Sequence, residues 1–338
     1  MKLSEFYWHR ITPLHFLLWP ISILYSGIMS LKRLCYWLDL FPKTTLPVPV
    51  IVVDSITVED KSKTPFILWL VEFLKARGLR PGIISRGFND NTGTPIVVTT
   101  SSDQDTGGGK SLWLAQRCTD CPVWVGDDRV AAAEALLKAH PDCNILINDD
   151  GLQYYQLERD LEIVVIDYSE QNIGNGQIIP AGPLRGSLNR LQDVDAVVSN
   201  GKINHKFETE EWASIYSMNL KKDLFRHNLD TRNCITPAEL SNKRIHAIAD
   251  LDNAQWFFDH LLNLGITGDF HTFADNHKFK KKDFQFPDTD IILMLEEDAF
   301  KTRSFTINNL WVLPVEAQIG SSLREVIIKK IIGINFKA

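Results

Sequence analysis

The sequence predicts an α/β fold in which a doubly wound parallel sheet is followed by a second, smaller α/β domain. From Leu46 onward, short runs rich in β-branched residues alternate with helical stretches. These runs are continuously apolar, as in strands that a parallel sheet buries on both faces. The alternation stops in a polar, lysine-rich stretch after Asn200 and then resumes. We therefore expect an N-terminal helical part at 1–45, a larger domain at 46–200 and a smaller one at 201–338.

The N-terminal part contains an apolar and aromatic segment from Pro13 to Met29, which is followed by Lys32 and Arg33. A membrane-spanning helix needs about 20 mostly apolar residues. This segment is interrupted by His15 and Pro20 and has no small-residue cleavage site behind it. An interfacial helix therefore fits better than one that spans the bilayer. The alternative is a helix that packs on the protein's own core.

The larger domain opens with a strand, a helix and a second strand, a βαβ unit typical of parallel sheets. The helix ends at two stop signals, Arg77 in its last turn and Gly78 just beyond it. Further apolar runs predict more strands, and the run DRVAAAEALLKAH at 128–140 predicts a helix between two of them. The expected strands are 48–53, 80–85, 122–126, 143–149, 160–167 and 194–200, and the first helix is 65–78.

The smaller domain repeats the alternation of strand and helix. The run AQWFFDHLLNLG predicts a helix at 254–265, and an amphipathic run at 321–332 predicts a C-terminal helix. Apolar runs predict strands at 244–251, 290–295 and 309–315. We therefore expect an α/β domain here as well.

Composition narrows the classes of function. The chain has 338 residues, 44% of them hydrophobic and 23% charged, which is typical of a globular protein. Its formal net charge of -6 argues against a general nucleic-acid binder, because a polyanion would be repelled on average. Five cysteines, spread through the chain without a cleavable signal peptide, fit a reducing compartment better than a disulfide framework. We expect an intracellular protein that binds no nucleic acid.

The first strand of the larger domain runs into a loop that ends in Lys63 and Thr64 at a helix start. This is the geometry of a phosphate site. Backbone N–H groups and the helix dipole hold the phosphates, the lysine reaches the outer ones, and the threonine hydroxyl binds Mg²⁺. In this interpretation Thr57, Lys61 and Ser62 contact the nucleotide as well.

The loop at 53–65 nevertheless contains no glycine. Phosphate-binding loops take positive φ angles and approach the phosphates closely, and glycine allows both. Here Glu59, Asp60 and Ser62 stand in those places. A non-glycine residue held at such angles costs about 1–3 kcal/mol. A carboxylate about 5 Å from a phosphate charge is repelled by roughly 3 kcal/mol, part of which Lys61 offsets. Alone, the loop is a weak sign of a nucleotide site.

Two further stretches favour the nucleotide site. Asp149 and Asp150 end a buried strand, the place where a nucleotide-binding sheet offers a carboxylate to Mg²⁺. The alternative is an ordinary strand-to-turn Asp-Asp-Gly. The stretch 174–201 is rich in glycine and proline, and it is too long for a simple connection. Long loops of this kind are usually functional.

Together these stretches resemble the tetraacyldisaccharide 4'-kinase family, lipid kinases that phosphorylate a lipid A precursor with ATP. The resemblance covers nearly the whole chain. It implies a P-loop NTPase-like domain, a second α/β domain, and a monotopic or peripheral helix at the cytoplasmic face of the inner membrane of a Gram-negative bacterium. The motifs that carry it are FYWHRITPLHFLLWPISILY, LKARGLRPGIISRGF, VGDDRVAAAEALL, DDGLQ, RDLEIVVID, GNGQIIPAGPLR and LWVLPV.

The resemblance also implies roles for single residues. In the transfer of the ATP γ-phosphate to the 4'-hydroxyl of a tetraacyldisaccharide 1-phosphate, Lys63 would hold the outer phosphates. Thr64 and Asp149 would bind Mg²⁺, and Asp150 and His277 would assist near the attacking hydroxyl. The expected substrate contacts are Arg86, Arg129, Asn175 and Arg185.

The departures from the family pattern fall where the chemistry is done. The family loop resembles GNITVGGTGKTP, and of its phosphate-binding end this chain keeps only Lys63, Thr64 and Pro65. Family members also carry GDEP, and Gly109 stands here at the position of its aspartate. Loss of such a carboxylate typically costs about 10²–10⁴-fold in rate. Two hypotheses stay open: an active ATP- and Mg²⁺-dependent lipid kinase, and an impaired member that binds lipid precursor or a partner without ATP turnover.

Overall fold

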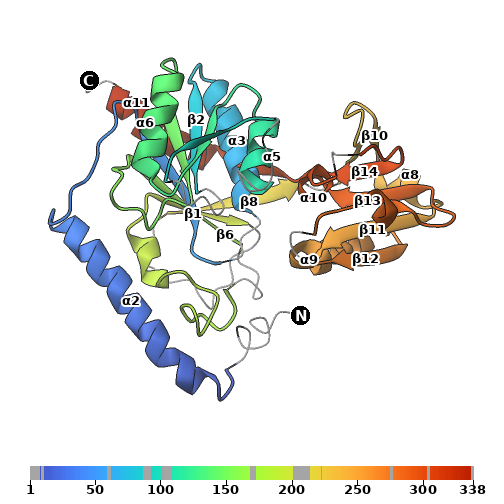
Figure 1. Cartoon of the computed structure of the whole chain (residues 1–338), viewed down its shortest axis with the longest axis horizontal. Coiled ribbons are helices and arrows are strands. Elements are labelled where there is room, and N and C mark those ends of the chain that lie inside the picture. The colour runs from blue at the N-terminus through green and yellow to red at the C-terminus, as the bar shows by residue number, and fades with distance from the viewer. Residues whose placement is uncertain are drawn as a thin grey trace. The chain divides into compact units, whose positions relative to one another are not determined.

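The computed structural model of the chain forms two compact units (Figure 1). Unit 1 comprises Met1–Leu220 and Ala317–Ala338, and unit 2 comprises Lys221–Glu316. The structure describes residues 8, 11–58, 62–86, 93–100, 102, 109–167, 173–200, 214–221, 223–274, 277–302 and 305–335.

A nine-stranded sheet forms the centre of unit 1. Its strands are β1 (Val50–Ser55), β2 (Pro81–Ser85), β3 (Ile96–Val98), β4 (Val123–Val125), β5 (Ile145–Asp149), β6 (Leu161–Asp167), β7 (Ala196–Asn200), β8 (Ile215–Lys221) and β15 (Glu316–Ile319). They lie in the order β15-β8-β7-β6-β1-β5-β2-β4-β3. The pairings from β8 to β4 are parallel, and β3 is antiparallel to β4. The predicted α/β fold with a mostly parallel sheet is confirmed.

Helices cover this sheet. They are α3 (Lys63–Lys75), α5 (Gly109–Arg117), α6 (Arg129–Ala139) and α11 (Ser321–Asn335), with a 3₁₀ helix η1 (Leu188–Gln192). Helix α3 packs on β1, β2 and β6 through buried residues such as Phe66 and Leu70. Gly78 follows α3 with a φ of 77°, a left-handed conformation that glycine adopts at little cost and that ends helices. Helix α6 begins where the Asp128 carboxylate accepts the N–H groups of Val130 and Ala131.

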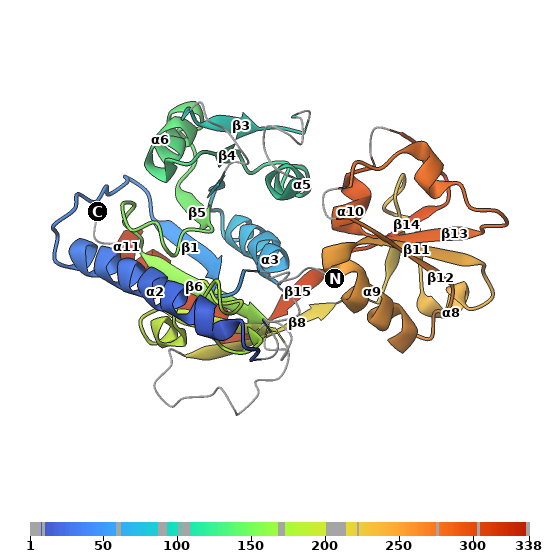
Figure 2. The same cartoon turned by 60° about the horizontal axis from the view of Figure 1, so that its bottom comes forward.

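The N-terminal helix α2 (His15–Trp37) lies along one side of unit 1 (Figure 2). Its two buried residues, His15 and Ser22, are polar. The His15 Nε2 atom lies 3.1 Å from the Ala181 carbonyl oxygen, and the Ser22 hydroxyl donates to the Ile178 carbonyl at 2.9 Å. These contacts hold α2 against the glycine- and proline-rich loop. Sequence reasoning left open whether its apolar side packs on the core, and it does not.

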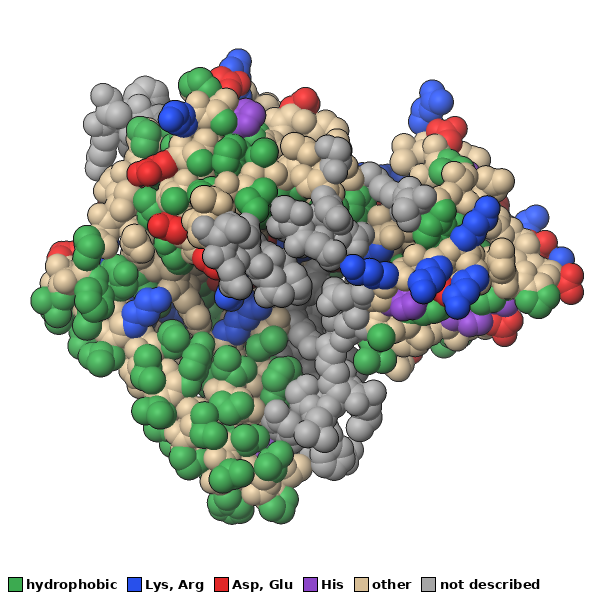
Figure 3. All heavy atoms as spheres, in the orientation of Figure 1, with side chains coloured by type: hydrophobic (Ala, Val, Ile, Leu, Met, Phe, Trp, Pro, Cys, Tyr) green, Lys and Arg blue, Asp and Glu red, His purple; other side chains and the backbone are tan. Residues whose placement is uncertain are grey.

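The outer side of α2 is apolar and exposed. Hydrophobic side chains gather over this helix in Figure 3. Nine of them are between 47% and 77% exposed: Phe16, Leu17, Ile21, Ile23, Leu24, Ile28, Leu31, Leu34 and Trp37. A water-facing helix normally has the opposite arrangement, with apolar residues inward. Within the described ranges, no helix combines the length and apolar character that crossing a bilayer requires.

The division of the chain differs from the ranges expected at 46–200 and 201–338. Unit 2 begins at Lys221 and ends at Glu316, and the C-terminal segment belongs to unit 1. Strand β15 joins β8 at the edge of the large sheet, and α11 packs on β6. The amphipathic pattern predicted the C-terminal helix but carries no information about which core receives its apolar face. The compact units therefore differ from the predicted ranges at both ends of the second domain.

Unit 2 has a six-stranded sheet in the order β10-β9-β14-β13-β11-β12. Its elements are β9 (Phe225–His227), β10 (Cys234–Ile235), α8 (Pro237–Leu240), β11 (Ile245–Asp250), α9 (Leu251–Asn263), β12 (Asp269–Phe273), η3 (Lys281–Phe284), β13 (Ile291–Leu295), α10 (Glu296–Phe300) and β14 (Leu310–Leu313). Both faces of the sheet are buried. Ala247 packs with Phe257 of α9, whereas its neighbour Ile248 belongs to the core that contains Phe284. Unit 2 is thus the smaller α/β domain that the sequence predicts.

A buried ionic cluster lies at the carboxyl ends of β11 and β13. The Lys301 ammonium is 2.7 Å from Asp250 and 2.9 Å from Asp298. Burial raises the pKa of Asp298 to about 7, and Asp250 adds repulsion, whereas Lys301 opposes the rise. The native state therefore holds a proton on Asp298 at pH values where the unfolded chain, with a pKa near 3.8, has lost it.

This difference predicts a pH dependence of unit 2. Stability should fall as pH rises from about 4 to about 7, by about 4 kcal/mol at most, because the native state binds the proton more tightly. Asp298→Asn should flatten that slope. Urea unfolding followed by tryptophan fluorescence at several pH values measures it. Asp230→Asn, at an exposed acid of the same unit, is the control and should keep the wild-type slope; an unchanged slope in Asp298→Asn contradicts the assignment.

Candidate active site

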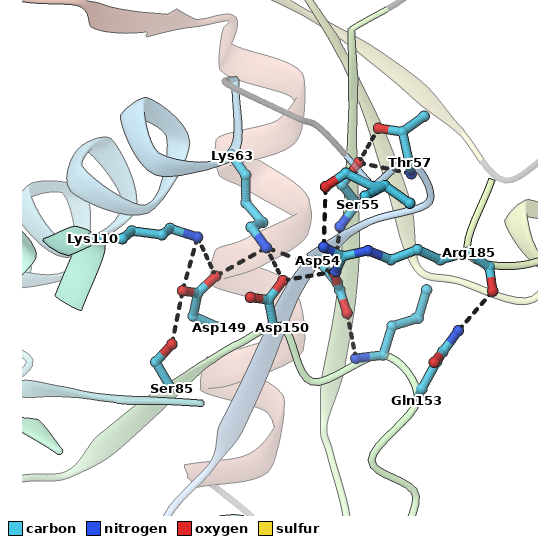
Figure 4. Close-up of polar contacts among 12 residues, drawn as sticks. Asp54, Ser55, Thr57, Lys63, Ser85, Lys110, Asp149, Asp150, Gln153 and Arg185 are labelled. Carbon is cyan, nitrogen blue, oxygen red and sulfur yellow. Dashed lines mark hydrogen bonds and ion pairs between the residues drawn. The ribbon is translucent and has the colours of Figure 1, made fainter. Parts of the chain in front are cut away.

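The strand order of the large sheet brings three acidic residues to the start of α3. In the pairing of β1 with β5, Val53 lies opposite Asp149. Asp54 follows Val53 on β1, and Asp150 follows Asp149 after β5. Lys63 is the first residue of α3, which begins after the loop that leaves β1. Two adjacent parallel strands and one helix therefore deliver these side chains to the same edge of the sheet (Figure 4).

Lys63 is the centre of this cluster. Its ammonium contacts Asp150 directly and lies 3.3 Å from Asp149 and 3.7 Å from Asp54. The residue is only 4% exposed. Burial alone would lower the pKa of Lys63, but the carboxylates of Asp149, Asp54 and Asp150 outweigh burial and raise it well above its ordinary value. Lys63 is therefore a permanently charged group at the N-terminus of a helix.

Asp149 is completely buried and has partners on both carboxylate oxygens. The Lys110 ammonium lies 3.0 Å from Oδ1 and 2.9 Å from Oδ2. The Ser85 hydroxyl donates to Oδ2 at 3.0 Å. Burial would raise the pKa of Asp149, but Lys110 and then Lys63 outweigh it and lower the pKa. Asp149 is thus an ionised acid held by two cations (Figure 4).

Asp150 stands at the turn that follows β5, with a φ of 58°. Aspartate tolerates this left-handed conformation better than most residues. Gly151 comes next, where a Cβ would collide with the Asn148 side chain. The Arg185 guanidinium lies 3.2 Å from the Asp150 carboxylate. Burial would raise the pKa of Asp150, but Lys63, Lys110 and Arg185 outweigh it and hold the pKa far below its usual range.

Asp54 is a member of the cluster that sequence reasoning did not select. Its carboxylate accepts the N–H groups of Ser55 at 2.7 Å and Leu152 at 2.9 Å, so it ties the end of β1 to the turn after β5. Burial raises its pKa, whereas Lys63 opposes the rise. An aspartate at a position where the family pattern has glycine is therefore accommodated by two backbone donors and a nearby ammonium.

Lys110 is the second functional candidate that the sequence did not identify. It lies in the first turn of α5, directly after Gly109. The one available signal was a cation after a run of glycines, GGGK, at 107–110. Such a run becomes informative only once the sheet places α5 beside Asp149.

Some of the residues predicted to contact the nucleotide lie together near Lys63. Ser62 and Thr64 flank Lys63 at the start of α3, and both are buried. Thr57 is also buried, and its hydroxyl lies 3.0 Å from the Ser55 hydroxyl. Lys61 lies outside the described residues.

Two of the expected substrate contacts, Arg86 and Arg129, have partners within the protein. The Arg86 Nε atom lies 3.5 Å from Asp127, and both side chains are exposed. The buried Arg129 donates to the Gly126 carbonyl at 2.7 Å and the Asp127 carbonyl at 3.2 Å. Its guanidinium also lies over the Tyr154 ring. Substrate contacts for these arginines remain a prediction.

Asn175 and His277 have partners outside this cluster. The Asn175 amide lies 3.0 Å from His15 Nε2 and donates to the Ala181 carbonyl at 2.8 Å, so it supports the attachment of α2. His277 belongs to unit 2, where its Nε2 atom is 2.9 Å from Asp283. Of the four predicted substrate contacts, Arg185 is the one that contacts Asp150.

The arrangement does not fit a metal ion at Asp149. A carboxylate has about four acceptor positions, and contacts from Lys110, Lys63 and Ser85 occupy both oxygens of Asp149. Among the described residues, no group of three or more histidine, cysteine, aspartate or glutamate side chains is arranged to hold a metal ion. In this arrangement the side chains of the protein take up both oxygens of Asp149, and the Mg²⁺ pair of Thr64 and Asp149 stays a prediction.

A parallel sheet, a helix that begins with a buried lysine, and paired aspartates on the adjacent strand define an α/β nucleotide-binding protein of the phosphoryl-transfer class. The sequence model of the tetraacyldisaccharide-1-P 4'-kinase family matches residues 14–332. The chain belongs to this family.

Individual relatives agree with this assignment. The tetraacyldisaccharide 4'-kinase of Nitrosomonas eutropha is 44% identical over 333 residues, which cover 98% of this chain and 84% of the relative. That of Methylobacillus flagellatus is 41% identical over 324 residues, covering 96% and 94%. The crystal structure of LpxK from Aquifex aeolicus in complex with ATP has a TM-score of 0.77 at 23% identity, over 92% of this chain and 98% of that one. This structural likeness shows the fold.

Proposed function

We propose that this chain is a lipid kinase that transfers the γ-phosphate of ATP to the 4'-hydroxyl of a tetraacyldisaccharide 1-phosphate, a step of lipid A biosynthesis. The observation that carries the proposal is the meeting of Lys63 with Asp149 and Asp150 at the start of α3, in a chain that belongs to the family over nearly its full length. The alternative of an impaired member without ATP turnover finds no support in the fold or the comparisons.

In this proposal Lys63 and the first turn of α3 hold the outer phosphates of ATP, with Thr64, Ser62 and Thr57 beside them. A lysine ammonium and a helix N-terminus both favour an anion. Lys63 is already fixed by its carboxylate neighbours, so little ordering is required when the phosphates bind. ATP supplies the phosphoryl group, and the chain's own residues supply position and charge.

Asp150 is the group we assign to the attacking hydroxyl. Its pKa is far below the usual range, because Lys63, Lys110 and Arg185 outweigh its burial. A carboxylate of this kind is a weak base, so its contribution is to accept a hydrogen bond from the hydroxyl and orient it. Arg185 holds the carboxylate in place and is the nearest cation for the substrate. A role for His277 remains part of the proposal.

A direct assay tests the proposal. Purified protein, Mg-ATP and tetraacyldisaccharide 1-phosphate should yield a product heavier by one phosphate, with the new group on the 4'-oxygen. Mass spectrometry measures the mass, and ³¹P NMR identifies the position. Product formation no faster than in a reaction without protein would overturn the proposal.

The apolar side of α2 supports a membrane surface as the location of this activity. We propose that α2 lies in the interface of the inner membrane at its cytoplasmic face, where the acyl chains of the lipid substrate are held. Nine exposed hydrophobic side chains on α2 would bury their surface in lipid, and its polar side remains fixed to the protein through His15 and Ser22. The helix would lie in the membrane surface without crossing it.

A further inference from the structure

The Asp149 carboxylate already holds a cation that belongs to the chain. Lys110 approaches both of its oxygens, at 3.0 and 2.9 Å, and Lys63 lies 3.3 Å from Oδ1. The Ser85 hydroxyl takes a further position on Oδ2 at 3.0 Å. These four contacts match the number of acceptor positions that a carboxylate offers, about four. Asp149 is also completely buried, so water cannot supply further partners.

A divalent cation has different requirements. Mg²⁺ binds oxygen at about 2.0–2.1 Å, demands nearly octahedral geometry and usually keeps several waters. An oxygen of Asp149 becomes available to it only if an ammonium leaves. Lys110 is the candidate to leave, because its side chain is 30% exposed whereas that of Lys63 is 5% exposed.

The charges of the cluster indicate what Lys110 does beside Asp149. The described ion pairs join the carboxylates of Asp54, Asp149 and Asp150 to the cations Lys63, Lys110 and Arg185, and Arg129 also acts electrostatically on Asp149 and Asp150. Lys110 lies nearer to Asp149 than Lys63 does, so without Lys110 the negative charge of Asp149 would act more strongly beside the start of α3. A triphosphate approaching that place would be repelled by roughly 3–4 kcal/mol for each close pair of unit charges. Lys110 removes this penalty without a metal ion.

We propose that Lys110 is a resident cation that neutralises Asp149 in place of a divalent metal ion and, with Lys63, binds the nucleotide phosphates. This inference rests on the proposed ATP site and adds a residue to it. Its consequence is that ATP binds to this protein with little dependence on Mg²⁺.

Calorimetric titration of ATP in Mg²⁺ and in EDTA tests the inference without measuring turnover. For the wild type, the two dissociation constants should agree within about threefold. Lys110→Gln should weaken binding in EDTA by about 10- to 100-fold, the usual loss for a charge-assisted hydrogen bond. In Mg²⁺ it should bind about as well as the wild type, because an oxygen of Asp149 is then open to the metal. Lys110→Arg should restore binding in EDTA.

The matched control is Lys75→Gln. Lys75 lies at the far end of α3, pairs with Glu72 and is 27% exposed, close to the 30% of Lys110, so the variant makes the same change in charge at similar exposure. It should bind ATP as the wild type does in both buffers. Melting curves of all variants confirm that each is folded.

The outcomes separate the two proposals. Wild-type binding that requires Mg²⁺ strictly, or Lys110→Gln binding in EDTA that equals the wild type, overturns the role of Lys110 and leaves the kinase proposal intact. Absence of ATP binding in both buffers overturns the kinase proposal itself.

Discussion

Replacement of Lys63 by alanine is expected to reduce phosphoryl transfer by about 10³-fold or more, because the cation at the outer phosphates acts where charge develops in the reaction. The same change should lower the free energy of unfolding by about 3–5 kcal/mol, the usual cost of removing one partner from a buried ion pair. Of the ion-pair partners among the described residues, Lys110 and Arg185 would then remain for Asp54, Asp149 and Asp150. Steady-state kinetics and urea unfolding measure the two effects.

Lys75→Ala is the control for Lys63→Ala. It shows whether an effect comes from the loss of any lysine charge on α3 or from the loss of the charge at Lys63. It removes a lysine from the opposite end of the same helix. There Lys75 forms a partly exposed ion pair with Glu72 at 3.4 Å and a longer one with Asp120 at 3.7 Å. A surface pair of this kind contributes about 0–1 kcal/mol. We expect nearly wild-type turnover and stability from it. If Lys63→Ala behaves like Lys75→Ala, the assignment of the phosphate site is wrong.

The triple variant Leu17→Gln, Leu24→Gln and Leu31→Gln should detach the protein from lipid vesicles. The three leucines lie seven residues apart on the outer side of α2 and are 69%, 65% and 61% exposed. Burying each side chain in lipid stabilises the bound state by about 1.5–3 kcal/mol. The triple change should therefore weaken vesicle binding by about 10³-fold or more. Vesicle sedimentation measures the bound fraction.

Unit 2 offers a matched control for this variant. Leu229 and Leu262 are also exposed, at 54% and 51%, but lie in unit 2, remote in sequence from α2. Their replacement by glutamine should leave vesicle binding unchanged. Because all five leucines are exposed, none of these changes should lower the melting temperature by much. Equal binding by the triple variant and the wild type would contradict the membrane role of α2.

Local patterns predicted most of the fold because they report burial directly. The run at 143–149 has an apolar centre, Ile145 to Ile147, and β5 is buried at every residue. The helix expected at 128–140 is α6, Arg129–Ala139, and its start is determined by the side chain of Asp128. Such features depend on neighbours a few residues away in sequence. The position of β15 in the sheet depends on distant residues instead, and the sequence of a four-residue edge strand does not indicate which strand it pairs with.

In the candidate site, too, the sequence predicted the residues that local patterns indicate and missed those that depend on the tertiary fold. Lys63, Asp149 and Asp150 were expected together because each stands at a recognisable junction of strand, loop and helix. Lys110 contacts Asp149 from 39 residues away. That contact depends on α5 packing on β4, which lies two strands from β5 in the order of the sheet. The same holds for Asp54, whose effect depends on the backbone of Leu152.

The return of the C-terminus to the large sheet has a consequence for synthesis. Strand β15 and helix α11 are translated after all of unit 2. Domains usually fold from the N-terminus onward as the chain emerges from the ribosome. Here the first domain to emerge still lacks an edge strand and the helix on β6 when the second is complete. The nascent chain must therefore keep the edge of β8 open until β15 arrives, and a premature stop before β15 would leave the nucleotide-binding domain without this strand and without α11.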